Sequence, residues 1–81
     1  MTTTHGYTND TWVTIVSDED YLLQVKGKKP IELVAGTLPT DIHTKGVTLN
    51  PGDAITSQML AGTLHIHSAV ENTVGEYTVA V

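Results

Sequence analysis

The sequence predicts an all-β fold, a small β-sandwich or barrel of six to seven short antiparallel strands with an extended N-terminal arm. Runs rich in Val, Ile, Leu, Tyr and Thr recur about every ten residues and are separated by Gly, Pro, Asn and Asp, as expected for short strands. Apolar and polar residues alternate within these runs, and none shows the spacing of about 3.6 residues that marks an amphipathic helix. A chain of 81 residues makes one domain. We therefore expect a polar arm over residues 1–10 and a single β domain over residues 11–81.

The N-terminal segment, MTTTHGYTND, is predicted to be an arm because it is polar and has no apolar period. Its one large side chain is Tyr7, and the arm is either disordered or ordered against a neighbour. The first predicted strand covers residues 12–16. Alternation along that strand places Val13 and Ile15 on one face, and Trp12, Thr14 and Val16 on the other.

The next two strands, residues 21–26 and 31–35, form the clearest hairpin signal, with a tight connection over residues 27–29. Pro30 stands at the start of the second of these strands, where a missing N–H costs least. Alternation predicts one shared face for Tyr21, Leu23 and Val25.

The middle of the chain contains a loop, a turn and two short strands. Residues 36–45 form the loop, and Val47 and Leu49 then alternate inward. The sequence NPGD at residues 50–53 is a strong turn signal, because Pro presets φ and Gly supplies a positive φ. Residues 54–58 are predicted as a short strand, although the segment TSQMLAG is also compatible with a helical turn.

Two strands complete the domain, residues 63–69 and residues 76–81. The first has Leu64 and Ile66 on one face and His65 and His67 on the other. The second places Tyr77, Val79 and Val81 inward, so the C-terminus is expected to be held in a sheet.

The composition excludes several classes of function. The chain carries nine Asp and Glu against four Lys and no Arg, with a net charge of −5, so we expect no nucleic-acid partner. No apolar run approaches the length of about 18 residues needed to span a membrane, and the N-terminus lacks the basic and apolar regions of a signal peptide. The absence of Cys excludes disulfides and thiol chemistry. A domain this small then depends on close packing, a metal or assembly with copies of itself.

His65 and His67 form the sharpest chemical feature. Alternate strand residues share a face, so two imidazoles at this spacing can converge on one metal ion. Two ligands are too few for a closed zinc site, and a third would come from His43, His5 or other subunits. The competing interpretation is two ordinary imidazoles on a solvent or interface face. We predict no cofactor and no metal, with the His65–His67 pair as the alternative.

No pattern in the sequence predicts an enzyme. The acidic run at residues 18–20 lacks the spacing and glycine of a calcium-binding loop and is interpreted as a solvated turn. Nothing resembles the G-x-S-x-G turn that carries a nucleophilic serine, and the carboxylates do not form an obvious pair flanking a cleft. The predicted site is instead an interface, with no catalytic residues. Its candidate residues are Thr4, His5, Tyr7, Trp12 and Tyr21, although Trp12 is also, with Tyr77, a candidate core residue in a domain without Phe.

The order of features over about residues 11–70 resembles that of small virion proteins of tailed bacteriophages. The resemblance is carried by the segment DYLLQVKGKKPIELVAG, by the sequence Leu38-Pro39-Thr40, by the segment GVTLNPGDAIT, and by Leu60 to Leu64 entering the strand with the two histidines. Such proteins are head decoration (cement) proteins, head-fibre bases or tail-associated adaptors.

The resemblance implies a non-enzymatic structural protein that binds and stabilises the capsid surface. The implied partners are the major capsid protein or another virion protein, together with copies of the same chain, a trimer being favoured. The implied location is the surface of a virion assembled in the host cytoplasm. Two alternatives stay open: a tail or fibre module that binds host-surface glycan, and a trimeric spike-like protein with a His metal site.

Overall fold

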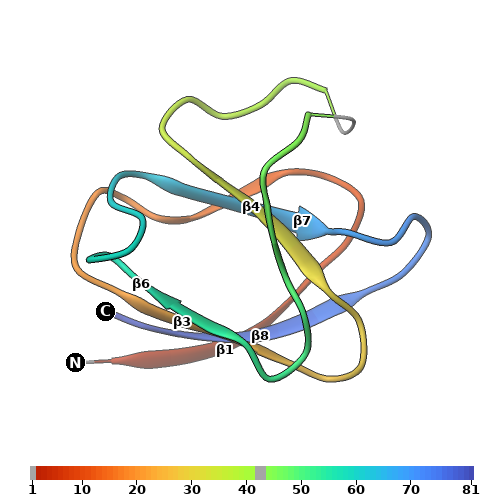
Figure 1. The fold of residues 1–81 in the computed structure, drawn as a ribbon, viewed down its shortest axis with the longest axis horizontal. Helices are drawn as coiled ribbons and strands as arrows, with labels where there is room; N and C mark the ends of the chain where they lie inside the picture. The colour runs from red at the N-terminus through yellow and green to blue at the C-terminus, as the bar shows by residue number, and fades with distance from the viewer. Residues whose placement is uncertain (1, 42–43) are drawn as a thin grey trace.

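Eight strands form two antiparallel sheets that face each other in the computed structural model, which describes residues 2–41 and 44–81 (Figure 1). The first sheet has the order β1-β8-β3-β6 and the second has the order β2-β7-β4-β5. The fold is therefore a sandwich, one of the two predicted architectures, but it has eight strands and not the six to seven predicted. The strands are β1 (Thr3–Thr8), β2 (Val13–Val16), β3 (Leu22–Lys26), β4 (Ile31–Ala35), β5 (Val47–Leu49), β6 (Ala54–Thr56), β7 (Leu64–Ser68) and β8 (Gly75–Ala80).

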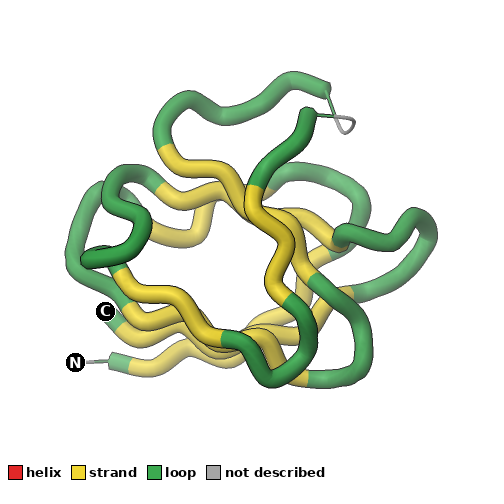
Figure 2. Tube along the Cα trace, in the orientation of Figure 1, coloured by secondary structure: helices red, strands yellow, loops and turns green. Residues whose placement is uncertain are grey.

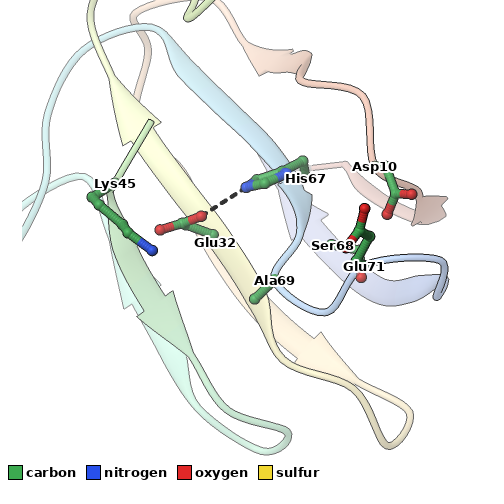
Figure 3. Close-up of a pocket in the computed structure, with 7 residues that line it drawn as sticks. All are labelled: Asp10, Glu32, Lys45, His67, Ser68, Ala69 and Glu71. Atoms are coloured by element: carbon green, nitrogen blue, oxygen red, sulfur yellow. Dashed lines mark hydrogen bonds and ion pairs between the residues drawn. The ribbon is translucent and has the colours of Figure 1, made fainter. Parts of the chain in front are cut away.

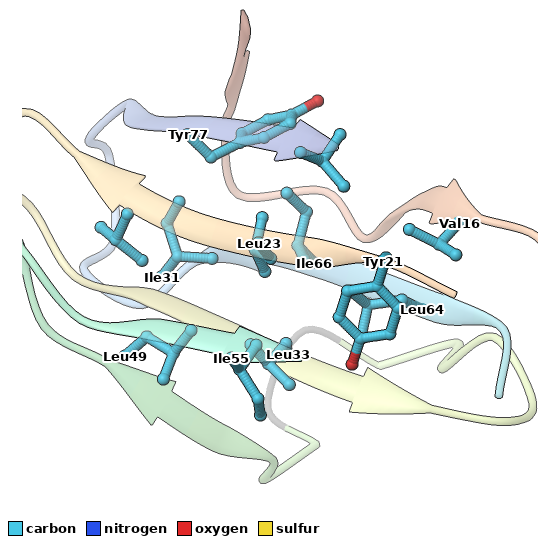
Figure 4. Close-up of a cluster of buried hydrophobic side chains, with 12 residues drawn as sticks. Val16, Tyr21, Leu23, Ile31, Leu33, Leu49, Ile55, Leu64, Ile66 and Tyr77 are labelled. Atoms are coloured by element: carbon cyan, nitrogen blue, oxygen red, sulfur yellow. The ribbon is translucent and has the colours of Figure 1, made fainter. Parts of the chain in front are cut away.

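The core lies between the sheets and is built from the alternating apolar positions of the strands (Figure 4). Leu23 and Val25 face it from one sheet, and Leu33 and Ile66 face it from the other; all four are fully buried. The complete cluster is Val16, Tyr21, Leu23, Val25, Ile31, Leu33, Leu49, Ile55, Leu64, Ile66, Tyr77 and Val79. Among the inward positions expected from the sequence, Val47 and Val81 are exposed instead: Val47 begins the edge strand β5, and Val81 follows the last residue of β8.

The predicted N-terminal arm is wrong, since residues 3–8 form the edge strand β1. This strand pairs with β8 from Thr3 opposite Ala80 to Thr8 opposite Gly75, and Thr2 and Val81 extend the pairing by exchanging backbone hydrogen bonds of 2.7 and 2.9 Å. The sequence signal was missing because the inward positions of β1 are Thr4, Gly6 and Thr8, none of them a large apolar residue. Gly6 is small for a reason: a Cβ there would lie 2.6 Å from the hydroxyl of Tyr77, whose ring crosses the strand.

The predicted hairpin of residues 21–26 and 31–35 is also wrong, because its two strands belong to different sheets. β3 pairs with β6 and β8, whereas β4 pairs with β5 and β7. The connection crosses from one sheet to the other with Gly27 at a φ of +71°. Alternation predicts which side chains of a strand point inward, but it does not distinguish a neighbour in the same sheet from a strand across the core.

A bulge in β2 changes the predicted faces of the first strand. Val13 pairs with Ile66 and Thr14 with His65, but Val16 pairs with Leu64, so the register shifts between Thr14 and Val16. Bulges insert one extra residue and re-aim the side chains that follow. Val16 therefore enters the core, while Trp12 and Thr14 lie on the outer face of the sheet.

Turns and loops connect the strands, and the described residues contain no helix long and apolar enough to cross a membrane (Figure 2). The strand predicted at residues 54–58 ends at Thr56, whose carbonyl then accepts the N–H groups of Met59 and Leu60 at 3.0 Å each. This turn corresponds to the helical alternative considered for TSQMLAG.

Candidate functional site

The outer face of the β2-β7-β4-β5 sheet carries a cluster of polar side chains that are largely buried. Glu32 on β4 lies directly opposite His67 on β7 in the strand register. Nε2 of His67 donates to Oε1 of Glu32 at 2.7 Å, and only 7% of the His67 side chain and 13% of the Glu32 side chain are exposed. The indole ring of Trp12 stacks on the imidazole of His67 with a centroid distance of 4.0 Å and a tilt of 30°. These three side chains form a single packed unit.

The same cluster holds the connection between β4 and β5 against the sheet. Nε1–H of Trp12 donates to the carbonyl of Asp41 at 3.1 Å, and the N–H of Gly46 donates to Oε2 of Glu32 at 2.9 Å. The imidazole of His65 donates through Nε2 to the carbonyl of Gly36 at 2.6 Å. Each of these bonds joins a side chain on the sheet to the backbone of the connection, so these polar side chains hold the connection in place on the sheet.

The pKa of the Glu32 carboxyl is held below its ordinary value of 4.5. Burial alone raises this pKa, because a charged group loses solvation. The hydrogen bond from the N–H of Gly46, the hydrogen bond and charge of His67, and the charge of Lys45 lower it, and together they outweigh burial. Glu32 is therefore a carboxylate at neutral pH.

A cleft of about 140 Å³ opens beside this pair (Figure 3). Lys45 lies on the far side of Glu32 from His67, and Asp10 and Glu71 lie at the other end of the cleft. Pockets that enclose small organic ligands have volumes of about 300–1,000 Å³. The cleft is thus large enough for a few water molecules and too small for a metabolite. Its lining residues are Asp10, Glu32, Lys45, His67, Ser68, Ala69 and Glu71.

His65 makes a separate pair with Thr14 across β2 and β7. Because Nε2 of His65 donates to a carbonyl, its Nδ1 carries no proton in the neutral ring and accepts the hydroxyl hydrogen of Thr14 at 2.8 Å. A hydroxyl, an imidazole and an orienting acceptor are the parts of a nucleophile–base arrangement. Here, however, the orienting group is an uncharged backbone carbonyl. Thr14 lines neither the cleft beside Glu32 nor a second cleft, which lies at the end of β1 beside Tyr7. The contact fixes the edge strand β2 to β7.

The structure confirms that His65 and His67 share one face of their strand but gives each a different partner. Among the described residues, no three His, Asp or Glu side chains converge on a position where they could hold a metal ion. His5, one suggested third ligand, lies in the opposite sheet and bonds to Glu76. The other, His43, lies outside the described residues.

The candidate interface residues divide into a buried group and an exposed group. Trp12 and Tyr21 are 7% and 3% exposed. Trp12 packs on His67, and Tyr21 lies in the core with its hydroxyl donating to the carbonyl of Leu60. Neither ring is available to a partner of the folded chain. Thr4, His5 and Tyr7 are exposed, and all three lie on β1.

His5 and Tyr7 form an ordered surface on the outer face of β1. His5 donates through Nε2 to Oε2 of Glu76 on β8 at 2.6 Å. The rings of His5 and Tyr7 meet edge to face with a centroid distance of 5.1 Å, and Tyr7 is 64% exposed. The first sheet therefore presents, at its β1 edge, an aromatic and polar surface whose rings are already positioned before any partner binds.

Sequence reasoning missed Glu32 as the partner of His67, and Lys45 as a positive charge near Glu32. Glu32 is one charged residue in the run PIELVA, and only the pairing register of β4 with β7 shows that it opposes His67. No short-range pattern carries that information.

Comparison of the chain with protein-family models, with curated proteins and with solved structures finds no match.

Proposed function

We propose that this chain is a structural protein that acts by binding a folded protein surface, without catalysis, through the side chains on the outer face of the exposed strand β1. The observation that carries the proposal is the contrast between the two polar regions. The buried histidines, Glu32 and Trp12 are all engaged in holding the chain's own connection, whereas His5 and Tyr7 present ordered side chains to solvent on the outer face of β1.

We further propose the setting implied by the resemblance: decoration of the capsid of a tailed bacteriophage, at the surface of the particle. Several features support this role. A small sandwich with a complete core is a rigid carrier for a binding surface, and its net charge of −5 favours solubility of free copies. The major capsid protein is the proposed partner.

Binding of the purified protein to capsid shells that lack it tests the proposal. The protein should co-sediment with the shells, and Tyr7→Ala should lose most of that binding, because exposed aromatic side chains dominate interface energies. Val74→Ala is a matched control, since Val74 is also exposed and apolar (58%) but lies outside β1. Equal binding by the wild-type, Tyr7 and Val74 proteins would contradict a β1 interface, and no binding by any of them would contradict the capsid role.

The glycan-binding alternative has one structural observation in its favour, the exposed ring of Tyr7. Sugar-binding surfaces stack aromatic rings on their ligands. Of the three aromatic candidates for the interface, Trp12 and Tyr21 are buried, so Tyr7 is the one whose ring a ligand can reach. A glycan array probed with the wild-type protein and with Tyr7→Ala distinguishes this alternative from capsid binding.

A further inference from the structure

The four edge strands of the sandwich differ in how well they are protected against pairing with another chain. β5 and β6 have three residues each, and β2 has four residues and a register shift. Short and bulged edges are the usual means by which β-proteins avoid edge-to-edge association. β1 has six residues, pairs with β8 without a register shift, and contains neither Pro nor Lys. It is the one long, regular edge among the described strands.

The hydrogen-bonding pattern shows which groups β1 offers. Thr2 and Val81 exchange both of their backbone hydrogen bonds, so they form a hydrogen-bonded pair of the antiparallel ladder. Such pairs alternate with non-bonded pairs, so Thr4, Gly6 and Thr8 also direct their N–H and C=O groups toward β8. The backbone groups of the alternate residues, Thr3, His5 and Tyr7, therefore point to the open edge.

We propose that two copies of the chain associate edge to edge through β1, antiparallel about a two-fold axis that passes beside His5. In this register His5 faces His5 of the second copy, and Thr3 faces Tyr7 on both sides of the axis. Each of these three facing pairs exchanges two backbone hydrogen bonds, about six in all. Shifting the register by two residues leaves only two facing pairs. The β1-β8-β3-β6 sheets of the two copies then form one continuous sheet across the dimer.

Charge favours a second copy as the occupant of this edge. The chain has a net charge of −5, so most approaches of two copies bring carboxylates together. Residues 1–9 contain no Asp, Glu, Lys or Arg, and the nearest carboxylate across the strand pair, that of Glu76, is already bonded to His5. The β1 edge is thus a surface at which two identical acidic molecules can meet without direct repulsion.

Room for the second strand is available at the end of β1. A cleft of about 290 Å³ lies there, lined by Tyr7, Thr8, Asn9, Thr11, Trp12 and Val13. In the two-fold register the start of the second copy's strand, at Thr2, arrives opposite Thr8 and beside this cleft. The two-fold pairing closes after two copies, so it gives a dimer in place of the trimer that the resemblance implies. The inference does not depend on the proposed virion role.

Disulfide cross-linking of single-cysteine variants tests both the contact and its register, because the natural chain has no cysteine. Facing residues of a hydrogen-bonded pair have Cα atoms about 5.5 Å apart, a distance that a disulfide can bridge. Under mild oxidation His5→Cys should give a covalent dimer. Thr3→Cys alone should stay mostly monomeric, whereas a mixture of Thr3→Cys with Tyr7→Cys should cross-link as a heterodimer. Monomeric His5→Cys, or cross-linking of Thr3→Cys as complete as that of His5→Cys, would overturn the proposal.

Sedimentation of the complete chain provides an independent measurement. The unmodified protein should show a concentration-dependent mass of two copies. His5→Pro removes two outward N–H donors from the dimer and none from the β1–β8 ladder, so its dimer should dissociate about thirtyfold more readily. His5→Ala is the control, since it loses the same imidazole but keeps the N–H, and it should dimerise more tightly than His5→Pro. A wild-type monomer at millimolar concentration, a mass of three copies, or equal weakening by the alanine and proline variants would each refute the edge pairing.

Discussion

Replacement of Glu32 by Ala is the most informative perturbation of the polar cluster. The carboxylate accepts the Nε2–H of His67 at 2.7 Å and the N–H of Gly46 at 2.9 Å. The imidazole is buried, so losing its acceptor costs about 1–3 kcal/mol, whereas the N–H of Gly46 is exposed and water replaces part of its bond. The sum is a loss of about 2–3 kcal/mol in the free energy of unfolding. For a domain of this size it lowers Tm by about 10–20 °C.

Thermal and denaturant unfolding followed by circular dichroism measure this effect. Glu71→Ala is the matched control, because Glu71 is an exposed glutamate that lines the same cleft. Exposed substitutions of this kind change stability by about 0.5 kcal/mol or less. If Glu32→Ala is no more destabilising than Glu71→Ala, the Glu32–His67 pair does not hold the connection between β4 and β5, and the structural interpretation of the cluster fails.

Three further predictions concern pH, packing and metal binding. The folded-state pKa of Glu32 lies below its ordinary value of 4.5, so its charge stabilises the fold above that pH. This stabilisation is lost as pH falls through the lower, folded-state pKa. In denaturant titrations, the stability difference between the wild type and Glu32→Gln should therefore shrink below pH 4.5. Gly6→Ala should cost about 1–3 kcal/mol of unfolding free energy, because its Cβ would overlap the Tyr77 ring, and should cost less in a Tyr77→Leu background. Addition of Zn²⁺ or a chelator should leave Tm unchanged, since Nε2 of His67 and both ring nitrogens of His65 have hydrogen-bond partners within the chain.

Each of these predictions has an outcome that contradicts it. A pH-independent difference between wild type and Glu32→Gln would show that the charge of the carboxylate contributes nothing. Equal costs of Gly6→Ala in the two Tyr77 backgrounds would show that the ring does not restrict the glycine. A chelator-dependent fall in Tm, with metal detected by elemental analysis, would restore the metal site considered for the histidine strand.

The sequence predicted inward and outward faces better than it predicted partners. Tyr21, Leu23 and Val25 enter the core as expected. On β7, Leu64 and Ile66 lie on the inner face and His65 and His67 on the outer face, also as expected. These assignments depend only on alternation within a strand, which is local information. In β2 even this failed, because a bulge after Thr14 is not marked by any residue in the run.

The errors concern relations between distant segments. The segment of β1 predicts an arm because its inward positions are Thr and Gly, and the reason for a glycine appears only when Tyr77 lies over it. A short Gly-containing connection usually makes a hairpin and therefore predicts one for residues 21–26 and 31–35, whereas here the connection crosses between sheets. For the same reason the candidate site was only partly predicted: Tyr7 and His5 were found, and the contacts of Glu32 were not.

We propose that this chain is a structural component of a virion, and its copy number in purified particles of the source tests this proposal most directly. Quantitative mass spectrometry against the major capsid protein gives this number. Decoration of the capsid predicts many copies, in a fixed ratio to the capsid subunits. A handful of copies per particle would indicate a tail or fibre location, and particles without the protein would contradict the virion role altogether.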